Sequence, residues 1–169
     1  MKVLPSARWR PNSEGLEHFW SGRWQKYGEN HPTLNKKKDD AMTFPIRLLW
    51  INALLFILFG AGFIAAPNAL SLFLTGAAPG TPSAVTDMRA TYGGMALGAG
   101  LFFGFCARHP TLLRAGLLAS LLVLSGIAGG RLVGILIDGS PNPFIIALFA
   151  AELLFAALFT ITLKRVQNR

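Results

Sequence analysis

The sequence has one cysteine, three histidines and little charge, and each shortage excludes a class of protein. A single cysteine, Cys106, excludes an internal disulfide framework and dithiol exchange within the chain. His18, His31 and His109 do not have the spacing of a zinc site, and none lies in an apolar segment where it could ligate a buried haem. Charged residues make up 14% of the 169 residues, against roughly a quarter in soluble domains. A soluble globular domain is therefore not expected.

Long apolar segments are what the sequence has in abundance. Four of them cover residues 46–66, 83–107, 111–137 and 143–163. Each reaches the about 20 residues that a membrane-crossing helix needs at a rise of about 1.5 Å per residue. Thr81 followed by Pro82 predicts a capped start for the second helix, and residues 68–75 are apolar but too short to cross. The pattern predicts an all-α integral membrane four-helix bundle with a short interfacial helix after the first span.

Residues 1–41 differ in composition from the rest of the chain. They contain eight Lys or Arg and five Asp or Glu, and they have no apolar run of six residues. Such a segment buries too little apolar surface to order itself, so we predict a polar, disordered cytoplasmic extension before a membrane domain at 42–169. An alternative is that translation begins at Met42. The run Lys36–Lys38 is interpreted as a solvated tail in preference to a polybasic contact with lipid head groups.

The basic residues outside residues 1–41 gather at one end of the predicted bundle. Six of them flank the spans at this end, whereas Arg89 stands alone at the other; the six are Arg47, Arg108, Arg114, Lys164, Arg165 and Arg169. Lys and Arg are enriched in cytoplasmic loops. This distribution predicts a bacterial inner-membrane protein with both termini in the cytoplasm.

Two ionisable residues, Arg131 and Glu152, lie within the predicted spans at nearly the same depth in the outer half. A charged side chain costs about 2.5–3.5 kcal/mol at a helix centre, so we predict that the two form an ion pair. Asp138, seven residues after Arg131, falls on the same helical face and could share the arginine. Asp87 and Arg89 are two residues apart, so one is expected to face the bundle and the other the head groups.

These residues define one candidate binding cluster in the outer half of the membrane. Its members are Asp87, Arg89, Tyr92, Arg131, Asp138 and Glu152. One interpretation is that the charges only hold the helices in register. The other is that they line a polar cavity for a ligand, a lipid head group or a proton.

Glycines recur at four-residue spacing in the second and third spans. This spacing lets helices approach closely, and it more often marks packing within a chain than a dimer. The glycines assigned to helix packing are Gly94, Gly98, Gly126, Gly130 and Gly134.

The string Asp87–Gly94 (DMRATYGG) opening the second span resembles the signature of a bacterial membrane family, domain of unknown function 4345. The step Gly130–Arg131, Asp138 with Gly139, and Glu152 also resemble that family. The resemblance covers about residues 46–165 and implies the four-helix fold. The family is loosely similar to DoxX-like membrane proteins, some of which are associated with respiratory or thiol-redox complexes. It carries over no catalytic residues.

Three functions remain open from the sequence. The first is association or the binding of a small ligand or lipid around the outer-half cluster, the second an oligomeric carrier that uses Arg131 and Glu152, and the third a quinone-associated redox subunit. The sequence leans against an enzyme, and no cofactor or metal site is evident. The expected partners are the lipid bilayer and a second copy of the chain or a larger membrane complex, and not nucleic acid.

Overall fold

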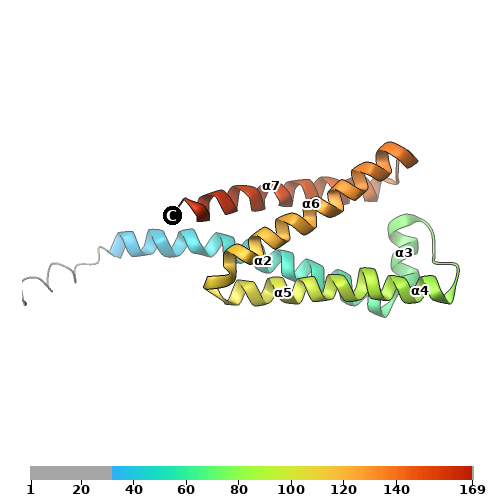
Figure 1. Ribbon diagram of the computed structural model, residues 1–169, viewed down its shortest axis with the longest axis horizontal. Coiled ribbons are helices and arrows are strands. Elements are labelled where there is room, and N and C mark those ends of the chain that lie inside the picture. Colours follow the sequence, from blue (N-terminus) through green and yellow to red (C-terminus); the bar gives the residue numbers. More distant parts are fainter. Residues whose placement is uncertain (1–31, 169) are drawn as a thin grey trace, which may run out of the picture. The chain divides into compact units, whose positions relative to one another are not determined.

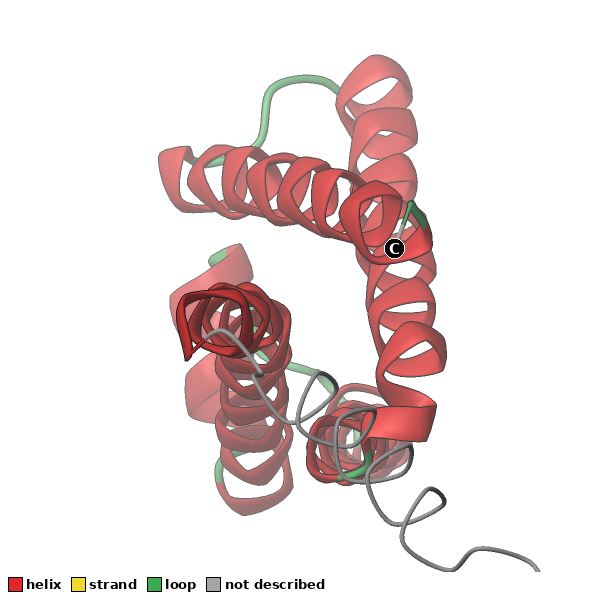
Figure 2. Cartoon of the chain, turned by 90° about the vertical axis from the view of Figure 1, so that its left-hand side faces the viewer, coloured by secondary structure: helices red, strands yellow, loops and turns green. Residues whose placement is uncertain are grey.

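A computed structural model describes residues 32–168 of the chain, and this part consists of helices joined by short loops, with no strand (Figure 2). The chain divides into two units, Met1–Asp40 and Ala41–Arg169. The predicted disorder of residues 1–31 lies outside the described residues. Residues 32–41, the last part of the predicted extension, form the beginning of helix α2 (Pro32–Ala65). Proline is favoured at the first position of a helix, and no further proline or glycine follows until Pro45, so nothing interrupts the helix before the apolar segment.

Four helical segments are long and apolar enough to cross a membrane, which confirms the predicted fold class. They are Thr43–Ala65, Pro82–Arg108, Pro110–Asp138 and Pro143–Gln167. The first lies within α2, and the second joins α4 (Pro82–Met88), a π-helical segment η1 (Arg89–Met95) and α5 (Ala96–Arg108). The third is a 3₁₀ turn η2 (Pro110–Leu112) followed by α6 (Leu113–Asp138), and the fourth is α7 (Pro143–Gln167). The chain is therefore a multi-pass membrane protein.

The predicted short helix is α3 (Pro67–Thr75), which follows α2 after one residue (Figure 1). It ends at Gly76, whose φ of 82° lies in the left-handed region that glycine adopts without strain. Thr81 caps α4 as predicted, because its hydroxyl accepts a hydrogen bond from the backbone N–H of Ala84 at 3.2 Å.

Helices α2 and α5 approach each other closely along glycines. A Cβ added at Gly60 would lie 2.4 Å from the backbone nitrogen of Leu97, and one at Gly100 would lie 2.8 Å from that of Ile57. No side chain fits at either position. The absence of a side chain therefore lets the two backbones pack directly against each other.

The apolar core lies where α2, α5, α6 and α7 meet, toward the end at which α2 enters the bundle and α5 leaves it. All four helices contribute fully or nearly fully buried side chains, among them Leu49, Ala53, Phe103, Leu117 and Phe159. No residue of α6 beyond Ala128 is buried. The four helices are thus tightly packed at one end and more loosely packed at the other.

The glycines that make close contacts are not those that the four-residue spacing selects. A Cβ at Gly98, Gly126 or Gly130 would meet no atom within 4 Å, and the nearest atoms to Gly94 and Gly134 belong to their own helices. Packing of these five glycines within the chain is therefore a wrong prediction. Spacing shows which glycines share a face of a helix, but only the position of the neighbouring helix decides which face is covered.

Candidate functional site

Arg131 and Glu152 form the predicted ion pair between α6 and α7. The Nε–H of Arg131 donates to both carboxylate oxygens of Glu152, each at a distance of 3.0 Å. The side chains are 22% and 12% exposed. Each charge is therefore neutralised where apolar surroundings would make an isolated charge costly.

Arg131 continues the inward face of α6. Leu117, Leu124 and Ala128 are buried on this face, and Arg131 follows Ala128 three residues later, near the position that completes a helical turn. The ion pair thus lies just beyond the point where the buried core ends. It faces the interior side of the α6–α7 hairpin, away from the exposed residues Leu122 and Val133.

The two terminal amino groups of Arg131 have no hydrogen-bond partner among the described residues. Both bonds to Glu152 use Nε, so the four N–H donors of Nη1 and Nη2 are unused. In the same part of the chain no buried side-chain nitrogen or oxygen lacks a partner. The unused donors must therefore be accessible from outside the protein.

Arg89 and Tyr92 form a second group of candidate residues, which packs against the C-terminal end of α2. A terminal nitrogen of Arg89 donates to the backbone carbonyl of Ile64, next to the last residue of α2. The Tyr92 ring stacks on Phe63 with centroids 5.3 Å apart. Buried Gly93 is so close to α2 that an added Cβ would lie 3.1 Å from the Ile64 nitrogen. Of the two predicted faces, the Arg89 face therefore packs on α2.

Asp87 and Asp138 are exposed and separate from both groups. The carboxylate of Asp87 accepts from the Thr91 hydroxyl of its own turn at 3.5 Å. Asp138 is the last residue of α6 and forms no ion pair with Arg131 in the part of the chain that the structure describes. The six candidate residues thus form an ion pair, a group at the end of α2 and two exposed carboxylates, and within residues 32–168 no polar contact joins these parts.

The buried pair Asn52 and Ser120 is a polar feature that the candidate cluster missed. The Asn52 amide donates to the Ser120 hydroxyl at 3.1 Å, and the two residues are 1% and 0% exposed. Both lie within apolar spans, so the same comparison of depths that paired Arg131 with Glu152 could have indicated them. Their neutral side chains are a weaker signal than charges because they cost less to insert into a membrane.

The arrangement offers hydrogen-bond donors on Arg131. Among residues 32–168 no group of three His, Cys, Asp or Glu side chains is placed to hold a metal ion. The pair of Arg131 and Glu152 carries no net charge, yet one side of its guanidinium remains able to donate. Such a site suits a ligand that accepts hydrogen bonds.

Comparisons with known proteins identify a family but no function. No curated protein and no solved structure matches the chain, and the similarity to DoxX-like proteins is not confirmed. The sequence model of a domain of unknown function (DUF4345) matches residues 47–163, which cover most of the four apolar helices and include the Arg131–Glu152 pair. The chain therefore belongs to the DUF4345 family.

Proposed function

We propose that this membrane protein binds the polar head of a membrane-soluble molecule at the Arg131–Glu152 pair. The proposal rests on one observation. The two terminal amino groups of Arg131, called here the guanidinium fork, are accessible and have no partner among the described residues. If the pair only held α6 to α7, the fork itself could face Glu152 in the bidentate geometry that arginine and carboxylate commonly adopt. The use of Nε alone leaves that fork for another acceptor.

The ligand is expected to be an acceptor without a strong negative charge. Glu152 already neutralises Arg131, so an added anion would give the site a net negative charge in apolar surroundings, which is costly. A carbonyl, ester or hydroxyl oxygen can accept from the fork without that cost. The partly exposed position beyond the core gives such a head group access while its apolar tail remains in the lipid.

The proposal includes the predicted location, an inner membrane with both termini in the cytoplasm. With that orientation the ion pair lies in the half of the membrane away from the cytoplasm. The other four candidate residues then lie toward the same side of the membrane, where lipid head groups are found. They are Asp87, Arg89, Tyr92 and Asp138.

Native mass spectrometry of the protein purified in mild detergent tests the proposal, through the fraction of protein that retains a co-purified amphiphile. Arg131→Lys preserves a cation that can pair with Glu152 but removes the planar fork. Two lost hydrogen bonds should lower the retained fraction about tenfold or more. The protein should keep its helical content.

A charge exchange, Arg131→Glu combined with Glu152→Arg, is the matched control for a purely structural role. It restores an ion pair between α6 and α7 but moves the guanidinium to the other helix. We expect the double variant to be about as stable as the unaltered protein but to lose the bound amphiphile. Retention of the amphiphile by both variants would show that the pair serves only to hold the helices together.

A further inference from the structure

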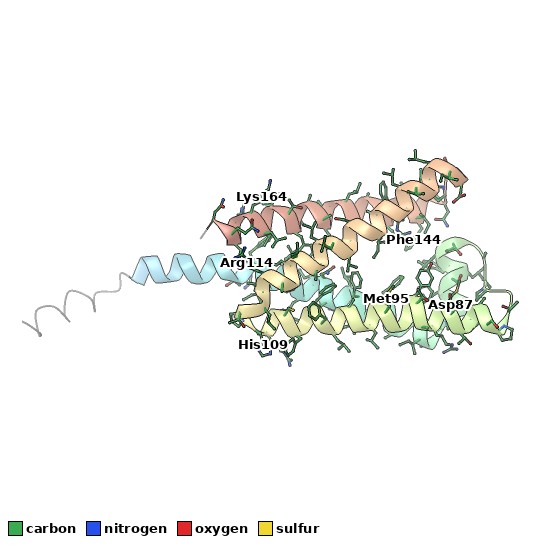
Figure 3. The ribbon with its side chains drawn as sticks, viewed as in Figure 1. Asp87, Met95, His109, Arg114, Phe144 and Lys164 are labelled. Atoms are coloured by element: carbon green, nitrogen blue, oxygen red, sulfur yellow. The ribbon has the colours of Figure 1, made fainter. Side chains whose placement is uncertain are left out.

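The end of the bundle at which α2 enters and α5 leaves carries a group of positive charges. Five exposed basic residues flank the helices there: Arg47, Arg108, Arg114, Lys164 and Arg165. Figure 3 shows His109, Arg114 and Lys164 at this end and Asp87 and Phe144 at the other. Among the residues whose side chains the structure describes, none of the five forms a salt bridge with a carboxylate.

One of these residues, Arg108, is held against an aromatic ring. Its guanidinium carbon lies 5.6 Å from the centroid of the Trp50 ring. Gly104, one turn earlier on α5, makes room for the same ring, since an added Cβ would lie 3.4 Å from Cζ3 of Trp50. Trp50 is 38% exposed. The indole is thus fixed on α5 by Gly104 and Arg108, with part of its surface open to lipid.

Arg47 lies at the same level of the bundle as Arg108. Successive contacts between the antiparallel helices pair Gly60 with Leu97, Ile57 with Gly100, and Trp50 with Gly104. The next turn of α2 toward its start therefore brings Arg47 to the level of Arg108. Arg47 is also three residues from Trp50, a spacing that places both side chains on neighbouring positions of one helix face.

We infer that Arg47, Trp50 and Arg108 form a site for the phosphodiester head group of an anionic membrane phospholipid. Two guanidinium groups at one level repel each other unless an anion lies between them, and arginine binds phosphate oxygens in a two-pronged geometry. Tryptophan is favoured where head groups meet hydrocarbon. The site is distinct from Arg131 and Glu152 and does not depend on the function proposed for them.

The aromatic contact distinguishes this site from a diffuse basic surface. Among the described residues, Arg114, Lys164 and Arg165 make no cation–π contact, so their side chains have no such anchor. Arg114 lies at the same end of the bundle and is exposed, but it lies on α6. It is therefore the matched control for Arg47 and Arg108.

Fluorescence of Trp50 in vesicles of defined composition tests the inference. Replacing Trp9, Trp20 and Trp24 with phenylalanine leaves Trp50 as the single tryptophan of the full chain. This protein is reconstituted with phospholipid whose acyl chains carry bromine, either as phosphatidylglycerol or as phosphatidylcholine at the same mole fraction. Bromine quenches the indole on contact, and we expect the anionic lipid to be preferred at Trp50.

Arg47→Gln or Arg108→Gln should each reduce this preference about fivefold, whereas Arg114→Gln should leave it largely unchanged. Having both variants keeps the test valid if one of them fails to fold. Equal quenching by the two lipids would overturn the inference, as would an equal loss in Arg114→Gln, which would indicate a diffuse surface charge. Inorganic phosphate added at millimolar concentration separates the two sources of phosphate: displacement of the anionic lipid by it would overturn the assignment to phospholipid.

Discussion

Arg131 and Glu152 neutralise each other on the interior side of the α6–α7 hairpin, so removing one should destabilise the protein more than removing both. Arg131→Leu leaves the Glu152 carboxylate, which is 12% exposed, without its partner. We expect this variant to lose about 3 kcal/mol of unfolding free energy. The double variant with leucine at both positions should recover most of that loss. Equilibrium unfolding in mixed micelles measures both values.

An equal loss in the single and double variants would contradict this view of the pair. It would mean that leucine is poorly accommodated at one of the positions, and that the charge itself contributes little. Glu152→Gln serves as the control, because it keeps the shape of the side chain and one hydrogen-bond acceptor for the Arg131 Nε–H while removing the negative charge.

The buried pair Asn52 and Ser120 gives a second prediction for single residues. Ser120→Ala removes the acceptor at 3.1 Å and leaves the Asn52 amide unsatisfied in the core. The cost should be about 1–3 kcal/mol of unfolding free energy. Combining it with Asn52→Leu should restore part of the stability, because the unsatisfied amide is then removed as well. A double-mutant cycle with additive losses would show that the hydrogen bond is of no consequence.

At this scale the sequence predicts contacts between charges better than contacts between neutral groups. Arg131 and Glu152 could be paired because a charge in hydrocarbon has so few acceptable partners that matching depth nearly suffices. The orientation of the Arg131 fork could not be predicted, since either Nε or the terminal amino groups can face a carboxylate. Arg89 could not be assigned to the Ile64 carbonyl because unpaired backbone acceptors are present at every helix C-terminus.

At the scale of helices, Gly100 should be essential for packing α5 on α2. A methyl group there would lie 2.8 Å from the Ile57 nitrogen and 2.9 Å from the Ala53 carbonyl oxygen, both of which are backbone atoms. Since backbone cannot move aside cheaply, Gly100→Ala should cost about 1–3 kcal/mol. Thermal unfolding in detergent and the yield of folded protein measure the effect.

Gly98→Ala is the control within the same helix. No atom lies within 4 Å of a Cβ at Gly98, and alanine favours helix over glycine by up to about 1 kcal/mol. The variant should be neutral or slightly stabilised. If Gly98→Ala were the more damaging substitution, α5 would have to present its other face to α2.

Asn142 connects two elements, and its two roles can be separated. Its side-chain oxygen caps α7 by accepting from the Ile145 N–H at 2.9 Å, and its amide nitrogen donates to the Leu74 carbonyl of α3 at 2.9 Å. Asn142→Asp keeps the cap but cannot donate. We expect α7 to remain intact while residues 67–75 exchange their amide hydrogens about fivefold faster, as measured by mass spectrometry.

Asn142→Ala removes both interactions and should also increase exchange in the first turn of α7. Unchanged exchange of residues 67–75 in both variants would show that α3 is held by other contacts. One such contact is the pairing of Phe73 with Phe144, whose ring centroids are 5.3 Å apart.

The helices themselves were largely predictable, whereas their internal geometry was not. Apolar length and the breakers between segments predicted all four spans, and Thr81 with Pro82 predicted the start of α4. The π-helical segment Arg89–Met95 has no comparable signal, because one altered turn depends on what packs against it. The start of α2 at Pro32 has no such signal either. Composition indicates whether a segment can form a core, but it does not show where a nucleated helix begins.

For the whole molecule, the uneven distribution of basic residues predicts how it lies in the membrane. Arg47, Arg108, Arg114, Lys164 and Arg165 share one end, whereas Arg89 lies at the other. Positive charges near the ends of spans oppose translocation, so the basic end should remain in the cytoplasm. The proposed binding site at Arg131 should then open toward the opposite face of the membrane.

Labelling of single cysteines with a membrane-impermeant maleimide tests this orientation. In a bacterial host with Cys106 replaced by alanine, the Ser140→Cys variant places a thiol in the loop between α6 and α7, and the Asn168→Cys variant places one just after α7. The first should react in intact spheroplasts and the second only after permeabilisation. The reverse result would place Arg131 in the cytoplasmic half and redirect the search for its ligand to that leaflet. Because one helix separates the two positions, reaction of both from the same side would mean that α7 does not cross the membrane, which would refute the four-span arrangement itself.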